Sequence, residues 1–470
     1  MKYVYIVGIC GTAMASLAGL LKSKGYNVVG SDANAYPPMS DMLKAQGIEV
    51  KIGYSQENIA GLIENIEFAI IGNVVRKENV EAEELIRRGI PYYSMPSFME
   101  RFILPDYNVL VVAGTHGKST TTSMLATTLD IMGESPSFLV GAIPLNFGQS
   151  FRTSTGRYFV IEGDEYDTAF FDKVPKFLHY LPYSAIITSI EFDHADIYSD
   201  FEVYKEQFVK FSKMVNREGF LVLKDDEVIK RIIKRDDIPL IFYGENQNSD
   251  AFIRQVSYKE NFMEVSSTIN GKEVNYRLQV YGFQNALNSL SVITFLGRLG
   301  FETNKILTAI EGFKGVKRRM EFIGDYNGIG VIDDFAHHPT AVRITIDAAR
   351  KAYIETGRYK RLISIFEPRS NTSRRNIFFD GYSKAFLGSD IVVMAKPYKK
   401  DDGIKDELNV NGVLQNLEKC GIKGFCGGGV SGLKEVIMEN ARKGDLLLFM
   451  SNGDFGGLLR ETVNLLKGDV

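Results

Sequence analysis

The sequence predicts an α/β protein of several domains, each built around a mainly parallel sheet. Short apolar runs alternate with amphipathic stretches of helical length along most of the 470 residues. Strands that alternate with helices in this way form βαβ units, and such units pack into parallel sheets. At roughly 150 residues per domain, a chain of this length holds about three domains.

The predicted strands are short apolar runs that end at turn or polar residues. They are Val4–Val7, Val28–Gly30, Phe68–Ile71, Val109–Ala113, Phe159–Ile161, Ala185–Thr188, Leu362–Phe366, Ile391–Met394 and Leu446–Met450. Helical patterns lie between them, for example Met14–Lys24 and Ser119–Met132. Residues 251–280 differ, because their side chains alternate with a period of two around Asn270-Gly271, which favours an antiparallel hairpin. We therefore expect a mixed sheet in the middle of the chain.

Two breaks in this pattern indicate domain boundaries. One lies at Leu104-Pro105-Asp106, just before a new strand, and the other near Gly312–Gly315, after the helical stretch Asn304–Glu311. The predicted domains are residues 1–105, 106–312 and 313–470.

The composition excludes several classes of protein. With 55 basic and 58 acidic residues the net charge is −3, which argues against a dedicated nucleic-acid or membrane-surface binder. Three cysteines form no disulfide framework, and no apolar run is long enough to span a bilayer. The first residues lack the features of a signal peptide, so we expect a cytoplasmic protein.

The sharpest local signal is a glycine-bearing loop between a strand and a helix. Val109–Ala113 runs into Gly114-Thr115-His116-Gly117-Lys118-Ser119-Thr120. Backbone N–H groups at the start of a helix bind phosphate, the lysine would reach the terminal phosphates, and the serine hydroxyl would bind Mg²⁺. The string is shorter than the common phosphate loop and alone also fits a tight turn. Its place between strand and helix favours phosphate binding.

A second glycine turn, Gly8-Ile9-Cys10-Gly11, follows the first strand, and Asp32 closes the next one. This is the layout of a dinucleotide-binding site, in which the turn faces a diphosphate and the aspartate accepts from a ribose hydroxyl. The third glycine of that fingerprint is missing, so a plain glycine turn is an equal alternative.

Carboxylates gather after two consecutive strands of the central segment. One group follows Phe159–Ile161 and the other, which includes His194, follows Ala185–Thr188; the acidic residues are Glu162, Asp164, Glu165, Asp167, Glu191, Asp193 and Asp196. Helix capping would explain them without a metal. Because they occur beside the phosphate loop, we favour a Mg²⁺ site.

The third segment contains Lys317-Arg318-Arg319 and Asp333-Asp334-Phe335-Ala336-His337-His338-Pro339. The paired histidines lack the spacing of a zinc site. Basic pairs are usually solvated, but Arg318 and Arg319, just past the predicted boundary, could instead reach into a cleft between domains and bind a phosphate.

In this order, these strings resemble the Mur ligase family, ATP-dependent enzymes that form amide bonds in peptidoglycan metabolism. The resemblance runs from residue 4 to about residue 460 and includes Asn285 and Asn288. It implies a Rossmann-like N-terminal domain for a UDP-sugar, a central ATPase domain with a phosphate loop and a mixed sheet, and a Rossmann-like C-terminal domain. The C-terminal domain would bind the incoming peptide and part of ATP.

The resemblance also implies roles for individual residues. Lys118, Glu162, His194 and Arg319 would be catalytic, and Ser119, Glu162 and His194 would hold Mg²⁺. ATP would contact Gly114, Thr115, His116, Gly117, Lys118, Ser119, Thr120, Asn285, Asn288, Arg319, Asp334 and His337. The UDP-sugar would lie along Gly11, Thr12, Ala13, Met14, Asp32 and Asn73, and the peptide along Arg369, Ser370 and Asn371.

Within the family, the chain resembles the branch that attaches L-Ala-γ-D-Glu-meso-diaminopimelate to UDP-N-acetylmuramate in peptidoglycan recycling. This resemblance rests on the segments Gly8–Met14, Gly30–Ser40, Gly72-Asn73, Asn146–Gly148, Asp164–Asp172, Glu367–Thr372 and Met450–Gly457. Asp454 departs from that branch, which tends to have glycine there.

Three alternatives stay open at this point. The nearest is a ligase of the same family that adds L-alanine alone to UDP-N-acetylmuramate. A Rossmann oxidoreductase would use the first glycine turn but leaves residues 109–339 unexplained. A non-catalytic UDP-sugar sensor would be expected to have lost Lys118, Glu162 or Arg319, and all three are present.

Overall fold

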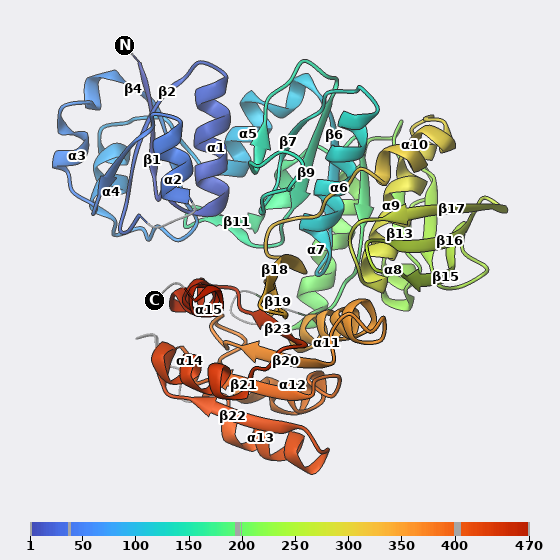
Figure 1. Ribbon diagram of the computed structural model, residues 1–470. Helices are drawn as coiled ribbons and strands as arrows, with labels where there is room; N and C mark the ends of the chain where they lie inside the picture. Colours follow the sequence, from blue (N-terminus) through green and yellow to red (C-terminus); the bar gives the residue numbers. More distant parts are fainter. Residues whose placement is uncertain (1, 36–38, 193–197, 199, 399–405, 469–470) are drawn as a thin grey trace. The chain divides into compact units, whose positions relative to one another are not determined.

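The computed structural model describes residues 2–35, 39–192, 198, 200–398 and 406–468 (Figure 1). The contacts within the chain define two compact units. One is Met1–Phe252 with Ile269–Gly271 and Asn288–Gly312; the other is Ile253–Thr268, Lys272–Leu287 and Phe313–Val470. Across the described residues, no helix combines the length and apolar character needed to cross a membrane.

The first sheet is parallel, with strand order β3-β2-β1-β4-β5. Its elements are β1 (Tyr3–Val7), α1 (Thr12–Ser23), β2 (Asn27–Asp32), α2 (Met39–Ala45), β3 (Glu49–Ile52), α3 (Glu57–Ala60), β4 (Ile66–Ile71), α4 (Val80–Arg87), β5 (Tyr92–Tyr93) and α5 (Met95–Phe102). Val4 and Ile6 share a core with residues of α1 and α2, whereas Tyr5 and Val7 share one with residues of α3 and α4. Because both faces are covered, the strands are continuous apolar runs.

The central sheet contains the strand that leads into the phosphate loop. Within the first unit, its strand order is β14-β13-β12-β6-β9-β7-β8. Its neighbours are parallel except for the antiparallel pair β7–β8. The strands of this region are β6 (Asn108–Ala113), β7 (Ser137–Leu139), β8 (Phe151–Arg152), β9 (Tyr158–Gly163), β12 (Ser184–Ile187), β13 (Leu221–Lys224) and β14 (Leu240–Gly244), with the small hairpin β10 (Asp167–Ala169) and β11 (Asp172–Pro175). The helices are α6 (Lys118–Ile131), α7 (Phe201–Met214), α8 (Glu227–Ile232), α9 (Phe283–Arg298) and α10 (Thr303–Ile310).

The predicted hairpin is confirmed. Strands β15 (Ala251–Tyr258), β16 (Met263–Ile269) and β17 (Lys272–Leu278) are successive neighbours, and β15 also pairs in parallel with β14. Asn270 and Gly271 connect β16 to β17 with φ angles of 49° and 76°. Positive φ at both central residues matches the twist of a two-residue hairpin, which explains the Asn-Gly pair. The mixed sheet expected in the middle of the chain is therefore present.

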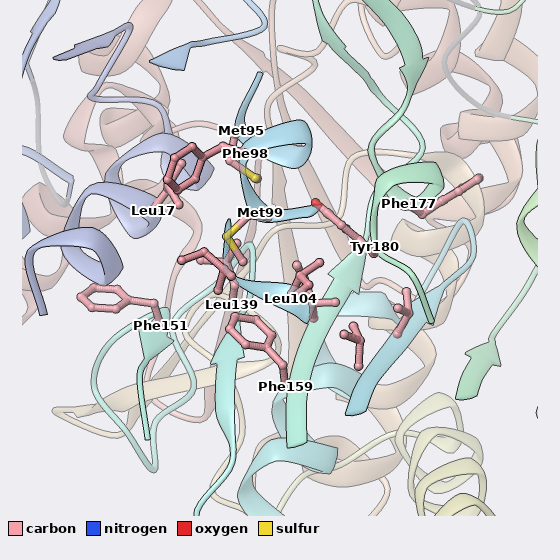
Figure 2. Close-up of a cluster of buried hydrophobic side chains, with 14 of the residues drawn as sticks. Leu17, Met95, Phe98, Met99, Leu104, Leu139, Phe151, Phe159, Phe177 and Tyr180 are labelled. Carbon is pink, nitrogen blue, oxygen red and sulfur yellow. The ribbon is translucent and has the colours of Figure 1, made fainter. Parts of the chain in front are cut away.

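One apolar core joins helices of the first sheet to strands of the central sheet. Figure 2 shows side chains from α1, α5, β7, β8 and β9 gathered in this core, among them Leu17, Met95, Phe98, Met99, Leu139, Phe151 and Phe159. Leu104, at the first predicted boundary, is 1% exposed and belongs to the same core. The chain at this boundary is therefore packed, and the boundary positions themselves stay predictions.

The third sheet, in the second unit, has the order β18-β19-β23-β20-β21-β22 and is parallel except for β18–β19. Its elements are β18 (Glu321–Tyr326), β19 (Ile329–Asp334), α11 (Pro339–Ala349), β20 (Arg361–Phe366), α12 (Phe379–Ala385), β21 (Ile391–Ala395), α13 (Val410–Lys419), β22 (Lys423–Gly427), α14 (Gly429–Asn440), β23 (Asp445–Met450) and α15 (Leu458–Lys467). Val331, Ile365 and Phe449 share a core with Leu433 and Leu458 of α14 and α15. Every strand predicted from the sequence is present, so the predicted α/β fold is confirmed.

Candidate active site

The phosphate loop connects β6 to α6. Gly114 and Gly117 have φ angles of 133° and 81°, which non-glycine residues rarely adopt. The loop is tied to the end of β12, because Thr115 N donates to Ser189 O at 2.9 Å and His116 N to Ser189 Oγ at 3.0 Å. The first N–H groups of α6 lack partners within the helix and are available to an anion. Residues Gly114–Thr120 therefore form a glycine-bearing loop between a strand and a helix, and their binding of phosphate stays a prediction.

Ser119 and Glu162 provide two oxygen atoms beside this loop. Ser119 Oγ donates to Glu162 Oε1 at 2.8 Å, and Gly141 N donates to Glu162 Oε2 at 2.8 Å. Mg²⁺ in phosphate-transfer sites is commonly held by one or two protein oxygens together with substrate phosphates and water. The pair fits that role. His194, Asp193 and Asp196, which the sequence analysis also singled out, lie outside the described residues.

The other carboxylates after β9 do not join Glu162. Asp164 pairs with Lys176 at 2.6 Å, and Asp167 pairs with Lys173 at 3.3 Å. Among the residues that the structure describes, no three His, Cys, Asp or Glu side chains come together in a metal-binding group. Asp164 and Asp167 therefore have separate lysine partners, and the Mg²⁺ site with Ser119, Glu162 and His194 stays a prediction.

Lys118 is engaged by its own loop and by Glu165. Its ammonium donates to Gly114 O at 2.6 Å and to Glu165 Oε2 at 2.7 Å. Burial lowers the pKa of Lys118, but the neighbouring carboxylates, with Glu165 the strongest, raise this pKa above its ordinary value overall. The lysine is thus firmly protonated, as electrostatic stabilisation of a phosphoryl group requires. The sequence places Glu165 in the right segment, but only the structure shows its contact with Lys118.

The glycine turn after β1 lies where the strand order of the first sheet reverses, the usual ligand position in such sheets. Gly8 has a φ of 83°, and α1 begins at Thr12 directly after Gly11. Asp32 accepts from Cys10 N at 2.8 Å, so this carboxylate already holds the turn. Asn73, after the adjacent β4, donates to Asp167 O at 3.4 Å. The residues predicted for the UDP-sugar, Gly11, Thr12, Ala13, Met14, Asp32 and Asn73, therefore share one edge of the sheet.

In the second unit, the two neighbouring arginines have different surroundings. Arg318 donates to Ser451 O at 2.7 Å and forms an ion pair with Asp333 at 3.3 Å, so it ties β23 and β19 together. The guanidinium groups of both arginines lie over the Phe335 ring, 5.3 Å from its centre for Arg318 and 4.9 Å for Arg319. Arg318 has a φ of 59°, an uncommon value that often marks functional segments. Arg318 is thus held by Ser451 and Asp333, and the role of Arg319 in binding phosphate stays a prediction.

Asp334 and His337 follow at the carboxyl end of β19. Asp334 is 4% exposed and accepts from Met320 N and Ala336 N, each at 2.7 Å. Burial raises the pKa of Asp334, while Arg319 and these N–H groups act in the opposite direction. His337 Nδ1 lies 3.0 Å from Phe335 O. Asp334 thus fixes the segment that carries His337.

Asn285 and Asn288 both belong to α9. Asn285 Nδ2 donates to Tyr281 O at 2.7 Å, which anchors the start of the helix. Asn288 is 1% exposed. The structure thus ties Asn285 to the backbone just before α9 and places Asn288 in the interior, and the ATP contacts of both stay predictions.

The segment after β20 carries the residues expected to bind the peptide. Arg369 Nη1 donates to Asp454 Oδ1 at 2.9 Å, and its guanidinium lies 4.5 Å from the centre of the Tyr398 ring. Ser370 Oγ accepts from Ser373 N at 3.0 Å, and Asn371 Oδ1 accepts from Arg374 Nη2 at 3.2 Å. The structure thus uses Ser370 and Asn371 to shape a turn. Arg369 projects towards Asp454.

Glu367 is a residue of this region that the sequence analysis did not select. It accepts from Ser451 Oγ at 2.5 Å, and burial raises its pKa. The available signal was its position directly after β20, where ligands bind in parallel sheets.

Comparison with known proteins places these elements in one family. Family models match along nearly the whole chain: the Mur ligase family, catalytic domain (residues 3–107), the Mur ligase middle domain (112–296) and the Mur ligase, glutamate ligase domain (318–453). The chain belongs to the Mur ligase family. Mur ligases are ATP-dependent enzymes that form amide bonds, and this chain is such a ligase.

Individual Mur ligases resemble the chain over its full length. The UDP-N-acetylmuramate–L-alanyl-γ-D-glutamyl-meso-2,6-diaminoheptandioate ligase of Haemophilus influenzae is 34% identical over 472 residues, which cover 99% of this chain and 100% of the relative. The UDP-N-acetylmuramate–L-alanine ligase of Acetivibrio thermocellus is 30% identical over 457 residues, which cover 96% of this chain and 94% of the relative. The crystal structure of a murein peptide ligase from Psychrobacter arcticus matches with a TM-score of 0.73 at 32% identity and covers 100% of both chains. The predicted three-domain Mur ligase architecture is thereby confirmed.

Proposed function

We propose that this Mur ligase joins the tripeptide L-Ala-γ-D-Glu-meso-diaminopimelate to UDP-N-acetylmuramate through an acyl phosphate, with cleavage of ATP to ADP and phosphate. The observation that carries the proposal is the full-length similarity to the Haemophilus influenzae ligase, whose name states this substrate pair. The lower identity to the L-alanine ligase, 30% against 34%, favours the tripeptide over alanine alone.

The chemistry requires an activated carboxylate, because a carboxylate oxygen is a poor leaving group. An oxygen of the UDP-N-acetylmuramate carboxylate attacks the γ-phosphorus of ATP, and ADP leaves. The neutral amine of the peptide then attacks the acyl carbon and loses a proton to solvent or a base, and phosphate leaves with the oxygen that the carboxylate contributed. The pKa of an α-amino group is about 8, so a neutral amine is readily available near physiological pH.

The residues support the first step electrostatically. An anionic carboxylate must approach an anionic triphosphate, and Lys118 and Arg319 would neutralise the charge of the transferring phosphoryl group. When bound, Mg²⁺ would be held by Ser119 and Glu162 and would neutralise further charge on the phosphates. His194 remains part of this proposal as a further ligand.

The assignments of ligands to residues are part of the proposal. ATP would lie along Gly114–Thr120, with Asn285, Asn288, Asp334 and His337, and the UDP-sugar along Gly11–Met14, Asp32 and Asn73. The peptide would contact Arg369, Ser370 and Asn371. We also propose that residues 1–105, 106–312 and 313–470 form the three domains. The enzyme would act in the cytoplasm, in peptidoglycan recycling.

Phosphate release from ATP and UDP-N-acetylmuramate tests the substrate assignment when tripeptide and free L-alanine are compared as acceptors. We expect a kcat/KM at least about a hundredfold higher for the tripeptide, because pocket contacts to further groups contribute several kcal/mol. Equal or higher kcat/KM for L-alanine would overturn the assignment in favour of the alanine-adding ligase.

A further inference from the structure

The Lys118 ammonium has acceptors for all of its N–H groups before any nucleotide is bound. It donates to Gly114 O at 2.6 Å, to Thr115 O at 3.3 Å and to Glu165 Oε1 and Oε2 at 2.9 and 2.7 Å. An ammonium group has three donors, and these acceptors use all of them. A phosphate oxygen can therefore bind Lys118 only by exchange with one of them.

Among the acceptors around Lys118, Glu165 is the one most similar to a phosphate group. Its side chain is 0% exposed and that of Lys118 is 12% exposed, so the pair is shielded from water. The two carbonyl groups belong to the loop itself and stay beside the lysine, whereas Glu165 belongs to the segment after β9. Like a phosphate, Glu165 carries negative charge.

Two tyrosines hold Glu165 in place. Tyr198 Oη donates to Glu165 O at 2.5 Å, and Tyr204 Oη donates to Glu165 Oε1 at 3.4 Å. Tyr204 is also 3.0 Å from Thr115 Oγ1, which lies in the phosphate loop. Tyr204 of α7 thus holds the carboxylate of Glu165, and Tyr198 holds its backbone carbonyl. The neighbouring Asp164 pairs with a different lysine, Lys176.

We propose that Glu165 is a positioning residue: it holds Lys118 on the loop in the nucleotide-free enzyme and gives up the ammonium to a phosphate group when a nucleotide binds. The inference rests on the proposed role of Lys118 in binding ATP. In the free enzyme, Glu165 balances the positive charge of the buried Lys118 ammonium and keeps this group beside the loop. The exchange costs binding energy, because the nucleotide must displace a buried carboxylate.

Removal of the charge on Glu165 should therefore tighten nucleotide binding. Glu165→Gln keeps the size of the side chain and the acceptor oxygen but no longer competes as an anion. The charged competitor for the ammonium is then lost, so ADP with Mg²⁺ should bind about tenfold more tightly. AMP lacks the phosphates that reach Lys118, and its Kd should not change. Asp167→Asn is the matched control, since Asp167 pairs with Lys173 instead.

Isothermal titration of the full-length enzyme and both variants with Mg-ADP and with AMP tests the inference. The expected result is a lower Kd for ADP in Glu165→Gln alone, with equal values for AMP. An unchanged or higher Kd for ADP in Glu165→Gln overturns the inference. In that case, ADP binding by the unaltered enzyme would still support the proposed ATP site. If the unaltered enzyme binds no ADP, the proposed ATP site fails and the inference fails with it.

Thermal unfolding covers the case in which Glu165→Gln is unstable. Without nucleotide, Glu165→Gln should lower the Tm by several degrees, because it leaves the Lys118 ammonium uncompensated. When Lys118→Met is added to Glu165→Gln, the double variant should regain most of the lost Tm. Saturating Mg-ADP should likewise raise the Tm of Glu165→Gln alone. A Tm penalty that neither change relieves would show that Glu165 has only a structural role.

Discussion

The hydroxyl of Ser119 donates a hydrogen bond of 2.8 Å to Oε1 of Glu162, which joins the first turn of α6 to the end of β9. Both oxygens therefore lie beside the phosphate loop before any ligand binds. Such preorganisation matters, because a metal-binding pair that is already in place needs little rearrangement.

Glu162→Gln tests this pair as a Mg²⁺ site. The amide keeps the size of the side chain and an acceptor for Ser119 but loses the charge that binds the cation. We expect the Mg²⁺ concentration for half-maximal phosphate release to rise at least about tenfold. Glu202→Gln, at an 80%-exposed side chain on α7, should have no such effect. An unchanged Mg²⁺ requirement in Glu162→Gln would contradict the assignment.

Lys118→Ala should abolish ligation and leave the fold intact. The variant removes the cation that stabilises the transferring phosphoryl group, and such groups contribute about a hundredfold to a thousandfold in kcat. The measurement is ATP-dependent phosphate release, with circular dichroism as the control for folding. Retained activity in a folded variant would refute the role of the loop in catalysis.

Arg318→Ala and Arg319→Ala should separate stability from catalysis. Arg318 bonds to Ser451 O and pairs with Asp333, so its loss should lower the free energy of unfolding by about 2 kcal/mol. Arg319 lies against Phe335, and its loss should mainly lower kcat. Denaturant unfolding and steady-state kinetics of both variants provide the comparison. The reverse pattern would assign the phosphate contact to Arg318.

Asp333 should make stability depend on pH in a defined window. Burial raises the pKa of Asp333 from 3.8 to about 6, against the opposing effect of Arg318. Because the folded protein then binds more protons than the unfolded chain, stability falls as the pH rises from about 4 to 6, by at most about 3 kcal/mol. Asp333→Asn should remove this fall.

Urea unfolding at a series of pH values measures the effect as the difference between the two proteins. Asp236→Asn, at an exposed position, serves as the control. A difference between wild type and Asp333→Asn that stays constant from pH 4 to 6 would contradict the raised pKa.

Local patterns were sufficient to predict the phosphate loop. Val109–Ala113 is apolar because the strand is buried, and Gly117 is required where the chain turns into α6 with a positive φ. The Asn270-Gly271 hairpin was predictable for the same reason. A similar pair, Asn327-Gly328, connects β18 to β19 with φ angles of 56° and 81°, and this available signal was not used.

The contacts of the acidic side chains were not predictable from the sequence. Glu162, Asp164 and Glu165 are close in the chain, yet they contact Ser119, Lys176 and Lys118, respectively. Which partner each carboxylate meets depends on how β9 packs beside β6 and on where the chain turns after it. A count of carboxylates therefore does not show which of them share a site. It also overlooks the counter-ion of Lys118.

Transfer of ¹⁸O from substrate to phosphate tests the central claim most directly. UDP-N-acetylmuramate labelled with ¹⁸O in its carboxylate is incubated with ATP, Mg²⁺, the tripeptide and the enzyme, and the products are analysed by mass spectrometry. We predict the amide product and inorganic phosphate that contains one ¹⁸O atom, because the carboxylate oxygen leaves with the phosphate. Amide formation with unlabelled phosphate, or labelled phosphate with L-alanine but not with the tripeptide, would contradict the account.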